Sequence, residues 1–474
     1  MPTPPSPTDA PHWAALLRGW RDHPGPLHTR LHTHLQHAIE RGELTPGQRL
    51  PAARTLAALL GVSRATTVTA LDDLTASGHL TRHVGRGTHV APTAPRAQPL
   101  LTLRTPVGAA HPSEIDLTIA VPVLTDQQRA RLRDAAAHAH YDSPYHPHGL
   151  PDLRDLIAQQ YTHAGLPTTP DQILITSGAQ QAIALTAHTL LRRGDTALLE
   201  TPTYFGAIDV IRAAGAHLTG TPVTAQHLDP HHFAHQTRTH HPRLAFLTPT
   251  HHNPTGTTLP HPARHHLAAH LHDTGLPTLE DDTLLDLPFT DTPTPPPQHP
   301  RPPRPHPQRR LPQQALLGGP THRLAAPPPT LAPTLKQAKT LTDFGSSQPA
   351  QHLALHLLAD LPTLISERRA AITPARDHLA HLLRTHLPDW TFTTPPGGQF
   401  LWIQLPTPTA SAYTHHAHRH GLRLYPGASM GVTPLPDQYL RIPFTLHPDH
   451  IPEAVNRLAR AWAEFTSRGS GRLA

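Results

Sequence analysis

Residues 50–90 read LPAARTLAALLGVSRATTVTALDDLTASGHLTRHVGRGTHV, and this stretch decides the fold of the N-terminal part of the chain. Residues 53–60 predict a short helix, Gly61 allows a turn, and Ser63 can cap a second helix. That helix is expected to turn three apolar side chains inward, Val68, Leu71 and Leu74. Two short extended runs follow around residues 84–87, where glycines permit the tight reversal of a β-wing. This order predicts a helix-turn-helix with a wing.

A further helix precedes this stretch. Apolar residues recur every four positions and predict a helix that ends near residues 41–42. Its inward positions are Leu27, Leu31, Leu35 and Ile39. We therefore expect an α+β winged helix-turn-helix domain over residues 11–91, followed by a linker with several prolines at residues 92–114.

Residues 50–90 resemble the GntR family of winged-helix transcription regulators along their whole length, including its LP-x-x-R and VSR-x-T signatures. The resemblance implies binding to a double-stranded DNA operator, with Gly85 and Arg86 in the wing that approaches the minor groove. It also implies that four side chains of the helices face the DNA, Arg54, Arg64, Thr66 and Thr67. The alternative is a helical scaffold without DNA contact. Guanidinium groups suit phosphates and guanine edges, and the arginines at the start of both helices favour DNA binding.

From Ile115 onward, strand-like runs alternate with helical stretches, which predicts an α/β fold with a mostly parallel sheet. The expected strands are residues 173–177, 196–200 and 243–249, with a helix through Leu191 after the first of them. Ligands of open α/β sheets bind where strands end in loops. After the first strand, Gly178 leads directly into the helix, so the amides of Ala179 and Gln180 can point at a phosphate. The alternative is a glycine that only makes a turn.

Four motifs follow one another in this region: ILITSGAQQAI (173–183), ETPTYFG (200–206), TPTHHNPTG (248–256) and TLEDDTLLDLPF (278–289). In order and approximate spacing they resemble fold-type I pyridoxal-phosphate aminotransferases, whose large domain is a three-layer sandwich. The resemblance implies that Tyr204 stacks on the pyridine ring, that Asn253 hydrogen-bonds its phenolic oxygen and that Asp281 pairs with its protonated nitrogen. An exposed acid is the alternative for Asp281. Arg441, in YLRIPF, would bind the α-carboxylate of a substrate.

A GntR-type domain joined to an aminotransferase-like domain is the arrangement of the MocR family, which this chain resembles over residues 11–290 and 326–465. The aminotransferase class I/II-like domain is then expected at residues 115–465, with a small C-terminal subdomain from about residue 375. The resemblance implies that this domain senses pyridoxal 5′-phosphate (PLP), sometimes with an amino acid, and that the protein forms a head-to-tail homodimer.

The chain departs from this family where a lysine should form a Schiff base with the cofactor, some thirty residues after Asp281. Residues 291–312 contain ten prolines and predict that no central strand forms. Two glutamines and an alanine stand in the place of the lysine, Gln313, Gln314 and Ala315, and Thr283 replaces the usual nearby tyrosine. Both changes weaken the expected binding of the cofactor.

One hypothesis is a pair of compensating frameshifts that bound about residues 291–325. A shift of one base can turn the codons of PQQA (312–315) into codons for Leu-Ser-Lys. A competing interpretation is that Lys336 or Lys339 supplies the lysine. Both belong to the helix expected after the missing strand, where a lysine on the surface is the ordinary alternative.

Three functions remain open. The first is a DNA-binding regulator that senses PLP or a PLP–amino acid adduct, and the second is a PLP-dependent aminotransferase with a DNA-binding appendage. The third is a degenerate regulator that cannot bind PLP covalently. The missing lysine argues against the enzyme.

Composition narrows the protein class. The net charge of +6, from 39 basic and 33 acidic residues, permits nucleic-acid binding without demonstrating it. Cysteine is absent, which excludes disulfides and thiolate metal sites, and no leader or membrane-spanning run is visible, so we expect a cytoplasmic protein. The 44 histidines show no H-E-x-x-H or comparable spacing. We therefore attribute their number to a bias in amino-acid composition and expect no metal site.

Overall fold

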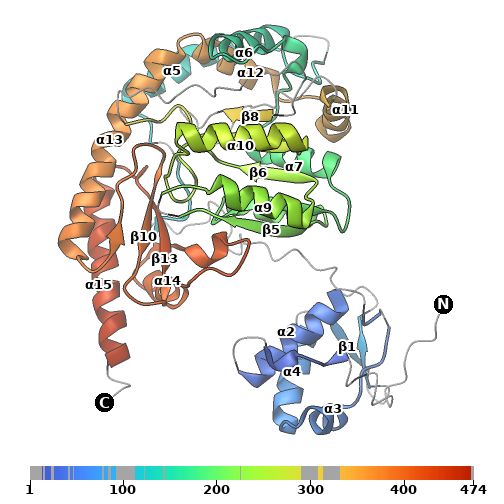
Figure 1. Cartoon of the computed structure of the whole chain (residues 1–474). Helices are drawn as coiled ribbons and strands as arrows, with labels where there is room; N and C mark the ends of the chain where they lie inside the picture. The colour runs from blue at the N-terminus through green and yellow to red at the C-terminus, as the bar shows by residue number, and fades with distance from the viewer. Residues whose placement is uncertain are drawn as a thin grey trace. The chain divides into compact units, whose positions relative to one another are not determined.

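The computed structural model describes residues 13, 16–22, 26–40, 43–45, 47–76, 79–83, 87–91, 113–121, 123–141, 145–224, 226–289, 308–312 and 331–470. The chain divides into two compact units, residues 1–100 and 101–474 (Figure 1). Within the described ranges, no helix combines the length and the apolar character needed to cross a membrane.

The first unit is a winged helix-turn-helix, as predicted. It contains η1 (Trp20–Asp22), α2 (Leu27–Glu40), α3 (Ala53–Leu60), α4 (Arg64–Ala76) and the antiparallel strands β1 (Leu80–His83) and β2 (Gly87–Val90). Gly61 ends α3 with a φ of 62°, a conformation that favours glycine. Ser63 caps α4, because its Oγ accepts a hydrogen bond from the amide of Thr66 at 3.1 Å.

The core of this unit follows the predicted periodicity with two exceptions, Val68, which is only half-buried, and Leu27. Leu31, Leu35 and Leu74 are fully buried, together with Trp13. Leu27 was expected on the same face but is 41% exposed. It is the first residue of α2, so it extends beyond the apolar cluster that begins one turn later.

The second unit is built on a sheet of five parallel strands in the order β5-β4-β6-β7-β8. Their bounds are β4 (Thr196–Thr201), β5 (His217–Pro222), β6 (Leu244–Leu247), β7 (Thr278–Asp282) and β8 (Gln308–Pro312). The predicted strand at residues 173–177 is reduced to a single bridge at Leu174. The amide of Ile175 donates instead to the carbonyl of His148, in a loop.

Side chains that alternate along the strands build three layers. Ala197 and Leu199 of β4 pack with α7 (Ala179–Leu190) and α8 (Phe205–Ala213). Leu198 points to the other face and packs with α9 (Pro230–His240) and α10 (His261–Thr274) (Figure 1). The unit is therefore the predicted three-layer α/β sandwich with a parallel sheet.

Residues 291–312 were predicted to form no central strand, but their last five residues form the strand β8. β8 pairs in parallel with β7, with Leu311 opposite Asp281 and Pro312 opposite Asp282. Only the final residue of β8 is proline, and β8 is the edge of the sheet as described, where a missing N–H group is tolerated. Residues 290–307 and 313–330 lie outside the described residues, so the frameshift hypothesis stays a prediction.

The remaining elements surround this sheet and form a small antiparallel subdomain. The helices are α5 (Asp126–Ala137), α6 (Pro151–His163), η2 (Pro170–Gln172), α11 (Ala332–Asp343), α12 (Gln348–Leu358), α13 (Leu361–His386), α14 (Ala410–His418), η3 (Gly427–Met430) and α15 (His450–Ser470). The antiparallel sheet has the order β12 (Tyr425–Pro426), β13 (Tyr439–Pro443), β10 (Phe400–Gln404) and β9 (Thr391–Phe392). β3 (Ile115–Asp116) pairs with β11 (Leu422–Arg423).

Candidate DNA interface and cofactor site

The two helices of the helix-turn-helix each carry an exposed arginine at the N-terminal end. Arg54 is the second residue of α3 and Arg64 is the first residue of α4, and both side chains are exposed. Thr66 is half-buried, and its Oγ1 lies 2.8 Å from the Oγ of Ser63. Arg54 and Arg64 are thus placed where they can reach a phosphate or a base edge.

Thr67 does not face solvent, contrary to the prediction from the family resemblance. Its side chain is fully buried, and its hydroxyl lies 3.0 Å from the carbonyl oxygen of Ala53 and 2.9 Å from that of Arg64. Thr67 therefore connects α4 to α3 and cannot touch DNA in this conformation. The predicted wing residues Gly85 and Arg86 lie outside the described residues.

In the second unit, Arg441 occupies the centre of a buried polar cluster. It lies on β13, is 2% exposed, and donates from Nη1 to Asn253 Oδ1 at 3.3 Å. Its Nη2 donates to the main-chain carbonyl of Thr118. The guanidinium carbon lies 4.3 Å from the ring centroid of Phe400 and 5.4 Å from that of Phe205. Burial lowers the pKa of Arg441 to about 10, so the side chain remains a cation at neutral pH.

Asp281 is a buried carboxylate within β7. The alternative of an exposed acid is wrong, because Asp281 is the fourth of the five residues of the strand and only 4% exposed. Its Oδ1 accepts a hydrogen bond from the amide of Thr283 at 3.0 Å. Burial nevertheless raises the pKa of Asp281 to about 6. Among the described residues no basic side chain forms an ion pair with it, so the carboxylate can accept a cationic partner from a ligand.

Tyr204 is hydrogen-bonded to Gln180 near the start of α7, and Gly206 leaves room for this contact. The Tyr204 hydroxyl donates to Gln180 Oε1 at 3.0 Å, and Gln180 Nε2 donates to the carbonyl of Gly206 at 3.2 Å. A Cβ atom on Gly206 would lie 2.5 Å from Cζ of Tyr204 and 2.6 Å from Oε1 of Gln180. Gly178, with a φ of 147°, begins α7 without a side-chain cap, so its neighbour Ala179 opens a helix end suited to an anion.

A buried acid and a buried histidine near these residues were missed by the sequence analysis. Glu200 Oε2 accepts a hydrogen bond from the amide of Thr248 at 2.6 Å and lies 3.5 Å from His252 Nε2. Burial raises the pKa of Glu200 to about 8 and lowers that of His252 to about 3, so both favour their neutral forms at pH 7. Neither residue was distinguishable from its neighbours in the motifs, because only the fold shows that both are buried.

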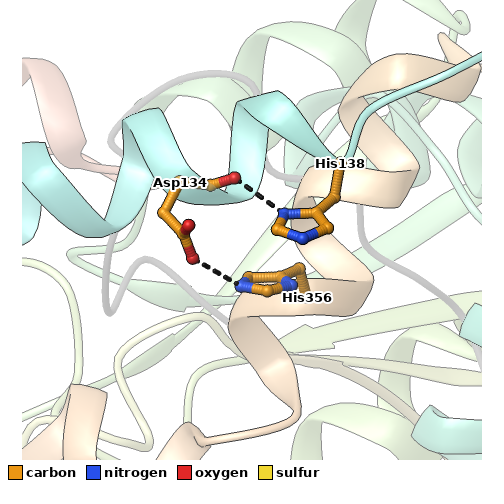
Figure 2. Close-up of side chains that lie close together, drawn as sticks. All are labelled: Asp134, His138 and His356. Carbon is orange, nitrogen blue, oxygen red and sulfur yellow. Dashed lines mark hydrogen bonds and ion pairs between the residues drawn. The ribbon is translucent and has the colours of Figure 1, made fainter.

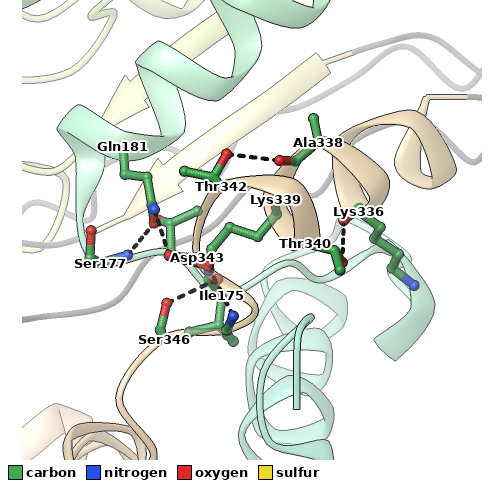
Figure 3. A network of polar contacts seen from close by, with 12 residues as sticks. Ile175, Ser177, Gln181, Lys336, Ala338, Lys339, Thr340, Thr342, Asp343 and Ser346 are labelled. Carbon is green, nitrogen blue, oxygen red and sulfur yellow. Dashed lines mark hydrogen bonds and ion pairs between the residues drawn. The ribbon is translucent and has the colours of Figure 1, made fainter. Parts of the chain in front are cut away.

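The structure corrects the expectation for Lys339, which is not a surface residue. Its side chain is fully buried, and its Nζ lies 2.5 Å from Asp343 Oδ1 (Figure 3). Asp343 also accepts a hydrogen bond from Gln181 Nε2 at 2.8 Å, and Gln181 Oε1 accepts one from the amide of Ser177 at 2.7 Å. Lys339 thus belongs to a network that holds α11 against the start of α7.

Lys336, the other lysine of the competing interpretation, contacts a different aspartate. Its Nζ lies 3.6 Å from an Asp171 carboxylate oxygen, outside the network of Lys339. Each of the two lysines therefore already interacts with an aspartate.

Comparisons with known proteins agree with both units. The family described as "Bacterial regulatory proteins, gntR family" matches residues 27–90, and "Aminotransferase class I and II" matches residues 120–291. An uncharacterized HTH-type transcriptional regulator of Bacillus subtilis, YdfD, is 27% identical over 399 residues, which cover 78% of this chain and 83% of the relative. The probable rhizopine catabolism regulatory protein MocR of Rhizobium meliloti is 33% identical over 258 residues, or 48% of this chain and 51% of that protein.

Among solved structures, the α-aminoadipate aminotransferase LysN of Thermus thermophilus, complexed with N-(5′-phosphopyridoxyl)-L-leucine, superimposes with a TM-score of 0.68 at 25% identity. The match covers 75% of this chain and 94% of that one. The chain is therefore a DNA-binding transcription regulator of the GntR type that carries an aminotransferase class I and II fold. Within that class its relatives include the regulators named MocR, PdxR and TauR, so its domain order is consistent with the MocR type.

Proposed function

We propose that the aminotransferase-like domain of this regulator senses pyridoxal 5′-phosphate or its adduct with an amino acid. The observation that supports this most is the hydrogen bond between the half-buried Asn253 and the buried Arg441, with a separate buried carboxylate at Asp281 that lacks a basic partner in the described structure. These residues come from distant parts of the chain. A site of opposite, separated charges suits a zwitterionic ligand with a cationic ring.

Each part of the cofactor has a suitable group in this site. Asp281 would hold the protonated ring nitrogen, Tyr204 would cover the ring and Asn253 would bind the phenolic oxygen. The start of α7, after Gly178, would hold the phosphate. When bound, PLP supplies an electron-withdrawing ring, and a carboxylate at its nitrogen maintains that property.

Arg441 would recognise the amino acid. Its Nε is buried and has no hydrogen-bond partner among the described residues, whereas its two terminal nitrogens bond Asn253 and Thr118. An α-carboxylate at the guanidinium would satisfy this donor and neutralise a buried cation. The domain would then distinguish PLP alone from PLP with an amino acid.

The structure favours a sensor over an aminotransferase. An aminotransferase needs a lysine to move the proton between substrate and cofactor. Lys336 and Lys339 are the only lysines in the chain, and both interact with aspartates. We therefore propose binding that does not depend on a covalent bond to lysine, in a cytoplasmic head-to-tail homodimer with domains at residues 11–91 and 115–465 joined by a linker at 92–114.

Equilibrium dialysis of the purified full-length protein with PLP tests this proposal. We expect saturable binding that Asp281→Asn weakens at least tenfold, because the amide removes the charge opposite the ring nitrogen. Borohydride reduction should fix no cofactor to the protein, since reduction traps only a lysine adduct. An absence of saturable binding would contradict PLP sensing. Of the three alternative functions, the degenerate regulator would then be the one that fits. Cofactor trapped on Lys339 would contradict the non-covalent form of the proposal.

The amino-acid part has its own test. Fluorescence anisotropy of operator DNA, selected from genomic fragments by the protein, should change when PLP and an amino acid are added together. Arg441→Gln should remove the contribution of the amino acid and keep that of PLP. An equal response of both proteins would contradict the role of Arg441.

A further inference from the structure

Two helices of the second unit bring histidines and an aspartate together on an exposed face. Asp134 and His138 lie four residues apart at the C-terminal end of α5, and His356 lies on α12 (Figure 2). One ligand atom from each side chain lies within 4.8 Å of those of the other two. A second pair, His140 and His352, stacks with ring centroids 3.7 Å apart.

The helices that carry these residues are fixed by a small apolar core. Ala135 of α5 packs in one buried cluster with Leu357 of α12 and Leu364 of α13. Ala135 follows Asp134 directly, and Leu357 follows His356. The main chain on both sides of the histidines is therefore held in place, while the exposed imidazoles can rotate.

The hydrogen bonds of His138 prepare it to bind a metal ion. Its Nδ1 lies 2.9 Å from the main-chain carbonyl oxygen of Asp134. A carbonyl oxygen can only accept, so Nδ1 carries the proton and Nε2 carries the lone pair. His140 is arranged in the same way, with Nδ1 3.0 Å from the carbonyl of His138. Histidine ligands of metals commonly donate their other N–H group to a carbonyl or a carboxylate.

His356 and Asp134 share one contact that a metal ion could replace. His356 Nε2 donates to Asp134 Oδ2 at 3.2 Å, and the rings of His138 and His356 stack with centroids 4.7 Å apart. A cation that replaced the proton between nitrogen and carboxylate would bind both atoms. The lone pair of His138 would supply the third ligand.

A second cluster of similar composition provides an internal comparison. His416, His420 and Glu464 also lie within 4.8 Å of one another. There, however, Arg419 Nη2 donates to His416 Nδ1 at 2.7 Å, which uses that lone pair and leaves the proton on Nε2. The guanidinium also places a positive charge beside the ring. That cluster is therefore unsuited to a metal ion.

We propose that Asp134, His138 and His356 bind a divalent late transition-metal ion, for which Zn²⁺ is the probe. Two imidazole nitrogens and one carboxylate oxygen suit Zn²⁺, Ni²⁺ or Co²⁺, whereas Ca²⁺ and Mg²⁺ require more oxygen ligands. Tetrahedral zinc places its nitrogen ligands about 3.4 Å apart, so ligand atoms that now lie within 4.8 Å of one another must close by at most about 1.4 Å. The bound ion would cross-link α5 to α12. This site is independent of the proposed PLP site and was not expected from the sequence.

The test is Zn²⁺ titration of the full-length protein without an affinity tag, by calorimetry in a buffer that does not chelate metal. We expect a site that the double variant His138→Ala/His356→Ala loses, and that Asp134→Asn weakens at least tenfold. A matched control removes two other exposed histidines of a helix, in His378→Ala/His381→Ala, and Glu464→Gln tests the second cluster. Both controls should retain the site.

The spectrum of added Co²⁺ gives a second readout, because its visible bands report the ligand geometry. Loss of these bands in the His138→Ala/His356→Ala protein alone would support the site. The proposal is overturned if that variant binds Zn²⁺ with the stoichiometry and affinity of the wild type, or if Glu464→Gln removes the tight site. Circular dichroism of each variant would show that it is folded.

Discussion

The hydroxyl of Thr67 on α4 donates to the main-chain carbonyl of Ala53 at the start of α3, 3.0 Å away. This contact fixes the two helices of the helix-turn-helix to one another. We expect Thr67→Val, which keeps the shape and removes the hydroxyl, to lower the free energy of unfolding of this unit by about 1–2 kcal/mol. Urea denaturation followed by circular dichroism measures it. Thr67→Ser retains the hydroxyl and should lose less.

The DNA affinity of folded Thr67→Val should equal that of the wild type, because the side chain is buried. A large loss of affinity in protein shown to be folded would restore Thr67 to the DNA interface.

Arg54 and Arg64 should contribute to DNA binding through charge. We expect Arg64→Ala to weaken binding and to reduce the slope of log K against log salt by about 0.9 if it neutralises one phosphate. Anisotropy titrations at several salt concentrations measure both quantities. Arg243→Ala, which removes an exposed arginine of the second unit, is the control. A slope that does not change in Arg64→Ala would place this arginine away from the phosphates.

Gly206 should be required for the shape of the cofactor site. In Gly206→Ala the new methyl group would overlap Tyr204 and Gln180, so one of them must move. We expect PLP binding to weaken at least tenfold while the fold is retained. Dialysis with PLP measures the loss. Gly275→Ala is a comparison that strains the backbone, since its φ is 63°, but whose added Cβ meets no other segment of the chain within 4 Å. Equal binding by Gly206→Ala and wild type would show that Tyr204 does not contact the cofactor.

Glu200 should make the stability of the apoprotein depend on pH. Burial raises its pKa from 4.5 to about 8, so its contribution to stability is complete below pH 4.5 and is lost as the pH rises through 8. Glu200→Gln stays neutral and should be more stable than wild type at pH 8.5, by up to about 4 kcal/mol, with little difference near pH 4.5. Urea denaturation at both pH values measures the difference. Glu464→Gln, on the exposed side of α15, should show no such trend.

The codons of residues 285–330 should decide the frameshift hypothesis. We expect them to contain a lysine codon in a shifted frame near Gln314, because PQQA can be read as Leu-Ser-Lys. Resequencing the gene checks this. β8 ends at Pro312, beside Asp282 of β7, so a lysine two residues later would follow the strand next to the one that carries Asp281. Codons that cannot encode lysine in any frame would rule the hypothesis out.

Local patterns were sufficient for most of the fold. The spacing of apolar residues and the signals at Gly61 and Ser63 predicted the bounds of α3 and the starts of α2 and α4, because these features act over one or two helical turns. The prediction of a strand at residues 173–177 was wrong because strand formation depends on a distant segment. A strand needs a partner, and the amide of Ile175 bonds the loop at His148.

For the candidate site, the motifs predicted which residues take part but not how those residues are arranged. The sequence indicated Tyr204, Asn253, Asp281 and Arg441, but gave no measure of their surroundings. Three features of the site depend on elements far apart in the chain: the burial of Asp281, the Nε of Arg441 that has no hydrogen-bond partner among the described residues, and the space that Gly206 leaves for Tyr204.

The sequence by itself determined the two kinds of domain, because capping, turns and apolar periodicity depend on neighbouring residues. The tertiary structure alone decided which side chains are inside. It placed Thr67 and Lys339 in the interior, although one was expected at DNA and the other at the surface. It also brought His138 and His356 together across two helices. Burial and ligand geometry arise from packing between distant segments, and no local pattern encodes them.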